Sequence, residues 1–259
     1  MKEKLSYVIL KKLASNYENV NNFEFLKYFK KSSIDKFHKT IKNYPESWKK
    51  INFKTYARFS NVLLNKNFGK DELLKIIFKR RSERNFQKYP LSLKEISYFL
   101  LGATITKVFD NNFDYNSFRA YPSAGARYSL EVYLFLLSSK DLKRGLYHYN
   151  VRFHCLEYMW DFKKKDLIKI FNQKFILNSS LIIFITCVIK RIYPKYGERS
   201  LRLALLEAGH LAQNFLLLAT KLGLKSCPVG GFKEQKILEI LDISQEEQEL
   251  PLYCIIIGK

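Results

Sequence analysis

The sequence predicts an α+β fold. The hydrophobic pattern changes along the chain from the spacing of helices to that of strands, then to one long helix, and then to a final helix and strand. Because this order does not repeat a βαβ unit, the α+β class is favoured over a doubly wound α/β fold. A hydrophobic content of 47% and an aromatic content of 15% indicate a globular core and argue against disorder.

Composition divides the 259 residues into two parts. Residues 1–70 are basic and rich in Asn, and we expect them to form an N-terminal extension. The composition changes near Gly69, which places one domain over residues 71–259. A chain of this length has room for one large domain with such an appendage.

Two helices are expected at the start of this domain. Asp71 can cap the first helix, in the segment DELLKIIFKRRS. The apolar positions that share one face of it are Leu73, Leu74, Ile77 and Phe78. Ser92 begins the second helix, because SLKE forms a capping box ahead of the apolar run ISYFLLGA.

Five short runs of apolar, β-branched and aromatic residues have the pattern of strands. They are LEVYLFLL at 130–137, GLYHYN at 145–150, FHCLEYM at 153–159, LIIFITCVI at 181–189 and the final PLYCIIIG. The short connection Val151-Arg152 predicts a hairpin between the second run and the third. A helix from about Glu234 to Leu241 precedes the last strand.

The longest helical pattern runs from Ser200 to Leu222 and is apolar on nearly every face. Polar residues such as Glu207 and His210 interrupt it only occasionally. We therefore expect this helix at the centre of the fold or at an oligomer interface.

Charge and cysteine usage narrow the class of protein. Lys and Arg number 45 against 24 Asp and Glu, a formal net charge of +21. The charges are scattered, so a Lys-biased composition is favoured over an anionic or acidic partner, and no nucleic-acid partner is predicted. The cysteines form no C-x-x-C pair and suit a reducing cytoplasm; they are Cys155, Cys187, Cys227 and Cys254.

Motifs of several other classes are absent from the sequence. No signal peptide is recognisable, and the apolar runs 181–189 and 215–219 are too short to span a membrane, so a soluble cytoplasmic protein is expected. Neither a G-x-G-x-x-G nor a P-loop motif occurs. Metal-ligand spacing is also missing, so no metal site is predicted at the histidines His38, His148, His154 and His210.

A basic segment, Arg80-Arg81-Ser82 with Arg84, could hold a phosphate, because guanidinium groups form bidentate charge-assisted bonds to phosphate oxygens. Taken alone, the segment fits a solvated helix terminus better, where cations favour the negative end of the helix dipole.

Two loops contain small residues that allow close approach to the backbone. One comprises Pro122, Ser123, Ala124 and Gly125, ahead of the first strand; the other contains Gly230 and Gly231, in CPVGGF between two helices. Each loop is equally compatible with a tight turn that binds nothing.

Taken together, the segments RRSERNF, RAYPSAGARYSLEVYLF, GLYHYN, YGERSLRLALLEAGHLAQNF, CPVGGF and PLYCIIIGK carry a family likeness. They resemble, in collinear order over about residues 70–259, the streptolysin-associated and microcin-type azoline dehydrogenases, a branch of the FMN-dependent nitroreductase family. WKKINFKTYARF is similar to the N-terminal region of that branch. The resemblance implies an α-β-α sandwich with a mainly antiparallel sheet, assembled as a homodimer with two FMN sites at its interface.

The resemblance also implies roles for particular residues. The FMN phosphate and ribityl chain would be held by Arg80, Arg81, Ser82 and Arg84. The isoalloxazine ring would lie along the other subunit's Pro122, Ser123, Ala124 and Gly125, together with Gly230 and Gly231. Many nitroreductases continue beyond Lys259 and supply further basic residues, so Lys259 is the expected substitute here. Arg127, where relatives often have Leu, would add a phosphate contact or line a surface.

Lys195-Tyr196 matches a Lys-Tyr pair of the azoline dehydrogenases; the alternative is an exposed loop lysine beside a packing tyrosine. One of the two would take the Cα proton while a hydride passes from Cβ to the flavin. The expected function is oxidation of peptide thiazolines and oxazolines to thiazoles and oxazoles in bacteriocin or toxin biosynthesis, with a precursor peptide and a cyclodehydratase as partners. Alternatives are an FMN-dependent reductase of nitro compounds, quinones or dehydroamino acids, and a noncatalytic scaffold for a biosynthetic partner.

Overall fold

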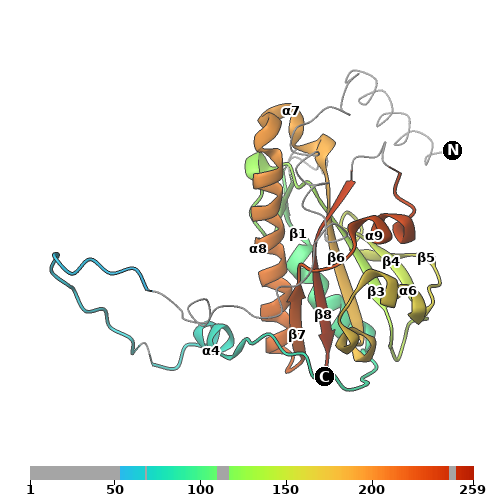
Figure 1. Cartoon of the computed structure of the whole chain (residues 1–259), viewed down its shortest axis with the longest axis horizontal. Helices are drawn as coiled ribbons and strands as arrows, with labels where there is room; N and C mark the ends of the chain where they lie inside the picture. Colours follow the sequence, from blue (N-terminus) through green and yellow to red (C-terminus); the bar gives the residue numbers. More distant parts are fainter. Residues whose placement is uncertain (1–52, 68, 110–116, 245–248) are drawn as a thin grey trace, which may run out of the picture.

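The computed structural model describes residues 53–259, except 68, 110–116 and 245–248 (Figure 1). Its centre is a six-stranded sheet with the order β5-β4-β3-β6-β8-β7, and every neighbouring pair in it is antiparallel. The strands are β3 (Leu130–Leu136), β4 (Gly145–Asn150), β5 (Cys155–Trp160), β6 (Leu181–Val188), β7 (Lys225–Val229) and β8 (Glu249–Gly258). The predicted α+β class with a mainly antiparallel sheet is confirmed.

Helices cover both faces of this sheet (Figure 1). On one face, α5 (Leu93–Leu100) and α8 (Ser200–Lys221) pack in one hydrophobic core with alternate residues of β3, such as Val132. On the other face, α6 (Lys164–Ile170) and α9 (Glu234–Leu241) pack in a second core with the intervening residues, such as Phe135. Since successive side chains of a strand point to opposite faces, the sheet serves both cores, and the α-β-α sandwich is confirmed.

The caps predicted for the first two helices of the domain are present. Asp71 Oδ1 accepts a hydrogen bond from the Leu74 backbone N–H at 2.7 Å and starts α4 (Glu72–Lys79). Ser92 and Glu95 form the reciprocal capping box of α5. α4 contains no buried residue, and Phe78 is 67% exposed, so its apolar face remains open in a single chain.

The second predicted loop is largely a strand, which corrects the sequence-based interpretation. The segment from Cys227 to Val229 lies in β7, paired antiparallel with β8, and only Gly230 and Gly231 follow it in a loop. Pro228 is tolerated because β7 is an edge strand, where a missing N–H breaks no ladder on the open side.

Two further details differ from the expected strands. The β4–β5 hairpin is confirmed, but its loop comprises the four residues 151–154 rather than Val151-Arg152 alone, because His154 adopts a φ of +48° and β5 starts at Cys155. A separate two-stranded sheet, β1 (Ile105–Val108) with β2 (Ser117–Arg119), was not predicted.

α8 is the central helix that its apolar pattern predicts. By length and composition the helical stretch Tyr193–Lys221 could cross a membrane, which the shorter apolar runs in the sequence did not indicate. In the fold this stretch packs along the sheet, and 44% of its apolar window is buried. We therefore assign its buried side to the protein core.

The predicted N-terminal extension is described only in part. Residues 1–52, which include the start of WKKINFKTYARF, lie outside the described residues. The stretch 53–67 is exposed throughout and runs away from the sandwich before α4 (Figure 1). Its separate role as an extension stays a prediction.

Candidate active site

Lys195 and Tyr196 lie directly against the loop that contains Gly125. They belong to α7 (Tyr193–Tyr196), in the connection between β6 and α8. A Cβ atom built on Gly125 would lie 2.6 Å from Tyr196 Oη and 2.8 Å from Lys195 Nζ. Lys195 Nζ is also 5.4 Å from the centroid of the Tyr196 ring. The fold thus brings the predicted dyad and the predicted flavin loop together, and a side chain at position 125 would displace the ends of Lys195 and Tyr196.

The hydroxyl of Ser123 faces inward, toward α8. Its Oγ donates to Glu207 Oε2 at 2.8 Å and accepts a hydrogen bond from the Tyr128 backbone N–H at 2.9 Å. Ser129 Oγ donates to the same carboxyl oxygen at 3.1 Å. Because these contacts occupy the Ser123 hydroxyl, its predicted contribution to a cofactor is limited to the backbone.

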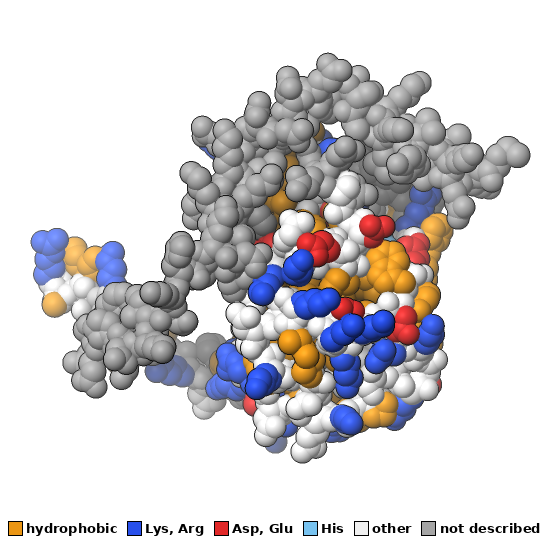
Figure 2. All heavy atoms as spheres, turned by 45° about the vertical axis from the view of Figure 1, so that its right-hand side comes forward, with side chains coloured by type: hydrophobic (Ala, Val, Ile, Leu, Met, Phe, Trp, Pro, Cys, Tyr) orange, Lys and Arg blue, Asp and Glu red, His pale blue; other side chains and the backbone are white. Residues whose placement is uncertain are grey.

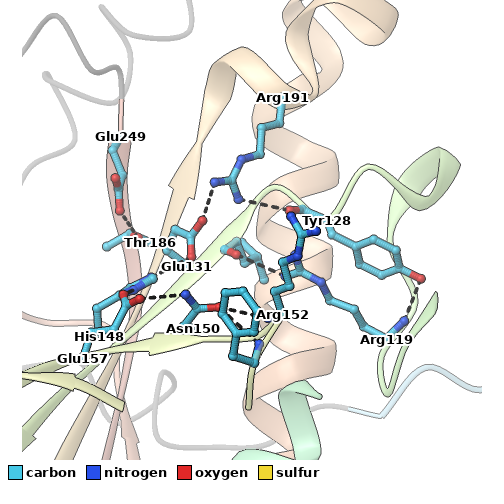
Figure 3. Close-up of polar contacts among 12 residues, drawn as sticks. Arg119, Tyr128, Glu131, His148, Asn150, Arg152, Glu157, Thr186, Arg191 and Glu249 are labelled. Carbon is cyan, nitrogen blue, oxygen red and sulfur yellow. Dashed lines mark hydrogen bonds and ion pairs between the residues drawn. The ribbon is translucent and has the colours of Figure 1, made fainter. Parts of the chain in front are cut away.

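A partly exposed ion pair holds the connection that carries the dyad (Figure 3). Arg191, just before α7, pairs with Glu131 of β3 and donates to the Tyr128 carbonyl oxygen at 3.4 Å. His148 Nε2 lies 3.0 Å from the same Glu131 carboxylate. Burial raises the pKa of Glu131, but Arg191 and His148 outweigh burial and lower this pKa to about 2. Glu131 is therefore a carboxylate at neutral pH and anchors Arg191.

The predicted phosphate-binding segment lies beside the edge strand β7. Ser82 forms a parallel bridge with Ser226, and the Glu83 N–H donates to the Ser226 carbonyl oxygen at 2.9 Å. Burial raises the pKa of the Cys227 thiol, and the positive charge of Arg84 opposes this rise. Arg84 therefore also lies near β7.

The guanidinium of Arg81 donates to the carbonyl oxygens of Phe78 and Arg80, at 2.9 and 2.8 Å. These bonds correspond to the helix-terminus alternative that the sequence left open. Among the described residues, no carboxylate forms an ion pair with Arg80, Arg81 or Arg84. All three side chains are at least partly exposed, so their charges are available to an anion.

Lys259 lies on the same side of the molecule as this basic segment. Its carbonyl oxygen accepts from the Gln87 N–H, and its Nζ is 4.9 Å from the centroid of the Tyr89 ring. Gly230 follows the far end of β7, and a Cβ there would meet nothing within 4 Å. The glycine loop therefore borders open space.

The dyad and the basic segment lie at opposite ends of α8 in one chain. α7 precedes the N-terminus of α8, whereas Lys221 at its C-terminus forms an ion pair of 3.8 Å with Glu72 of α4. The 22 residues of α8 span roughly 33 Å at about 1.5 Å per residue. The fold consequently does not bring Arg80, Arg81 and Arg84 to Lys195 and Tyr196 within one protomer.

Comparison with known proteins defines the class. The nitroreductase family model matches residues 77–259, and the chain belongs to this family of oxidoreductases. A protein of Methanocaldococcus jannaschii named for the same family is 33% identical over 71% of this chain and 89% of its own length.

Two further relatives are named for the processing of microcin B17 and for the trifolitoxin operon. The microcin B17-processing protein McbC of Escherichia coli is 27% identical over 73% of this chain and 68% of its own. The trifolitoxin operon protein TfxC of Rhizobium leguminosarum bv. trifolii is 29% identical over 84% of this chain, and the match spans 64% of TfxC. The expected resemblance to the microcin-type branch is confirmed.

Solved structures agree on the fold. The E. coli microcin synthetase complex McbBCD, with truncated pro-MccB17 bound, contains a chain that matches with a TM-score of 0.74 at 22% identity, over 95% of this chain and 96% of that one. A nitroreductase from Desulfovibrio desulfuricans in complex with FMN matches with a TM-score of 0.51 at 15% identity, over 73% and 87%.

Three residues of the site were not predicted as functional. Glu207 was noted only as a polar interruption of the long helix, and Arg191 and Glu131 were not singled out. A polar residue in an otherwise apolar helix was the available signal for Glu207. The ion pair had no comparable signal, because its partners are far apart in the sequence.

Proposed function

We propose that this protein is an FMN-dependent dehydrogenase that oxidises peptide-borne thiazolines and oxazolines to thiazoles and oxazoles. The observation that carries the proposal is the position of Lys195 and Tyr196 against Gly125. Two polar groups thereby lie beside the exposed loop that contains Gly125. The similarity to McbC and TfxC, proteins of microcin and trifolitoxin systems, supports a role in peptide natural-product biosynthesis.

The residues present fit both the phosphate and the ring of FMN. The partly exposed Arg80 and the exposed Arg84, with Arg81, Ser82 and Lys259 close by, offer the donors that a phosphate dianion prefers. The loop from Pro122 to Gly125 would border the ring, since its glycine leaves no Cβ in the way. When bound, FMN would supply a hydride acceptor.

Lys195 and Tyr196 would handle the proton of this reaction. One of them, in its deprotonated form, takes the Cα proton of the azoline, while the other orients the ring or stabilises the charge that develops. The ion pair of Arg191 with Glu131 holds α7 in place during this step, because Arg191 also bonds to the chain that leads into β3.

We further propose a homodimer with two shared sites. A second copy related by a two-fold axis across α8 would bring the basic segment of one chain to the Gly125 loop of the other, which one chain keeps apart. Leu205 and Leu206, 48% and 55% exposed on α8, together with the open apolar face of α4, supply the surface that such contact would bury.

The proposed partners are a precursor peptide carrying azolines and a cyclodehydratase complex, in the cytoplasm. Nucleic acid is not among them. Figure 2 shows Lys and Arg side chains spread over one face, with acidic and apolar groups between them and no single basic stripe. This distribution supports the interpretation of the charge of +21 as a scattered excess.

The test begins with the flavin. The purified protein should be yellow and release FMN on heating; recovery of FAD alone, or of no flavin after reconstitution, would contradict the proposal and favour a noncatalytic scaffold. With an azoline peptide in air, mass spectrometry should detect the loss of two hydrogens per ring. We expect molecular oxygen to be the acceptor.

A second candidate is a reductase of nitro compounds, quinones or dehydroamino acids, in which the hydride flows in the reverse direction. The 33% identity to the archaeal nitroreductase-family protein favours it. Rapid NADPH consumption with a nitroaromatic, without oxidation of the azoline peptide, would establish this alternative.

A further inference from the structure

The loop beside the dyad has an unusual backbone. Within four residues, Gly125, Ala126 and Tyr128 have φ angles of +60°, +52° and +47°. The left-handed region is unfavourable for residues with a Cβ atom, so Ala126 and Tyr128 are strained. Such a conformation persists only where the surrounding structure holds it, and it is concentrated at functional sites.

Glu207 is the group beneath this loop that can hold it. Its Oε2 accepts from Ser123 Oγ at the start of the strained stretch and from Ser129 Oγ at the end. Ser123 in turn accepts from the Tyr128 N–H and closes the loop on itself. One carboxyl oxygen thereby ties both ends of the stretch to α8.

Stability alone does not account for a carboxyl group at this position. Glu207 is 1% exposed, and its Oε1 has no hydrogen-bond partner among the described residues. Burial raises the pKa of Glu207, with the two serine hydroxyls, the positive charge of Arg119 and the Ser129 backbone opposing this effect. A half-satisfied buried acid is costly compared with an apolar side chain of similar volume, which indicates a role other than stabilising α8.

We infer that Glu207 is a positioning residue that fixes the 123–129 loop in its left-handed conformation and thereby sets Gly125 against Lys195 and Tyr196. The inference deepens the proposed function and rests on it for the identity of the ligand. The hold on the loop itself can be measured on the protein without flavin.

The first test measures the freedom of the loop in the apoprotein. Arg127 is exposed within the strained stretch, so trypsin cleavage between Arg127 and Tyr128 reports opening of the loop. Glu207→Met keeps length and helix propensity but removes both acceptor oxygens. We expect cleavage to accelerate on the order of tenfold, the equivalent of one buried hydrogen bond to a carboxyl group.

Two variants separate positioning from general destabilisation. Glu207→Gln retains an oxygen that both serines can reach, and should restore cleavage close to the wild-type rate. Phe215→Leu disturbs the buried core of the same helix beside Gly102, and should lower Tm without accelerating cleavage after Arg127. Should Glu207→Met fail to fold, Ser123→Ala removes the same link from the loop side and should accelerate cleavage in the same way.

The second test uses FMN itself. Glu207→Met should weaken FMN binding by about tenfold and change the visible absorption of the bound flavin, while Glu207→Gln should not. Equal cleavage rates after Arg127 for Glu207→Met, Ser123→Ala and the wild type would overturn the inference. A wild-type protein that binds no FMN would instead overturn the proposed function, and the trypsin comparison would still decide the role of Glu207.

Discussion

Tyr196 presses its hydroxyl against Gly125 so closely that a methyl group on the glycine would come within 2.6 Å of the phenol oxygen. Lys195 Nζ would lie 2.8 Å from the same methyl group. Gly125 lies at a φ of +60°, so a side chain there is opposed both by the backbone and by the two neighbours.

Gly125→Ala should therefore displace the dyad. We expect a large loss of azoline oxidation together with a destabilisation of about 1–2 kcal/mol from the left-handed backbone. Gly223→Ala is the matched control, because Gly223 has a φ of +68° but a Cβ there would meet nothing within 4 Å. Thermal unfolding should detect similar losses of stability in both variants, whereas turnover should fall only in Gly125→Ala. Equal turnover in the two variants would show that displacement of the dyad does not cause the loss of activity.

Mutation of the dyad should separate chemistry from binding. Lys195→Ala and Tyr196→Phe should remain dimeric and yellow, yet oxidise an azoline peptide ~10²–10⁴-fold more slowly, the range of general acid–base groups. Peptide mass spectrometry and the flavin absorbance of the same preparation provide the two measurements. Wild-type rates in both variants would contradict the catalytic role and favour the alternative, in which Lys195 is an exposed loop lysine and Tyr196 a packing tyrosine.

Loss of a phosphate-binding arginine should have the opposite effect. Arg84→Ala and Arg81→Ala should lose FMN on gel filtration and recover part of their activity when excess FMN is added. Lys165→Ala, an exposed charge on α6, is the control for net charge. If Arg81→Ala retains flavin like the wild type and only lowers Tm, then Arg81 serves only to stabilise the end of α4 through its hydrogen bonds there.

Light scattering tests the shared-site arrangement. The wild type should be a dimer at low micromolar concentration, and Leu206→Glu should dissociate it, because a charge would have to be buried in the α8 contact. Ile168→Glu is the matched control, since Ile168 is 60% exposed on α6, in the opposite helical layer. A flavin-loaded monomer would contradict sites built from two chains.

The ion pair of Glu131 with Arg191 predicts a pH dependence of stability. The pKa of Glu131 is lowered to about 2, so its contribution is present above the unfolded pKa near 4.3 and disappears as pH falls toward 2. Glu131→Gln leaves Arg191 without its partner and, because solvent screens the partly exposed pair, should reduce the free energy of unfolding by only about 1.5–3 kcal/mol at pH 7. Urea unfolding at several pH values should record this difference shrinking below pH 5; a constant difference would exclude the ionised pair as its source.

The sequence by itself determined the elements that local chemistry specifies. The caps at Asp71 and Ser92, the alternation in β3 and the apolar run of α8 each follow from neighbouring residues, so the helices and the main strands were predictable. The blocks PSAGA, EAGH and CPVGGF identified the family because their residues and order match along the chain.

Only the tertiary structure decided where these pieces meet. β7 has few residues and contains Pro228, so its hydrogen bonding to β8, not its composition, makes it a strand. Glu207 became a candidate positioning residue only when α8 packed under the serines of a distant loop. The separation of the basic segment from Lys195 by the length of α8 is likewise invisible in sequence, because it depends on how a rigid helix spaces its two ends.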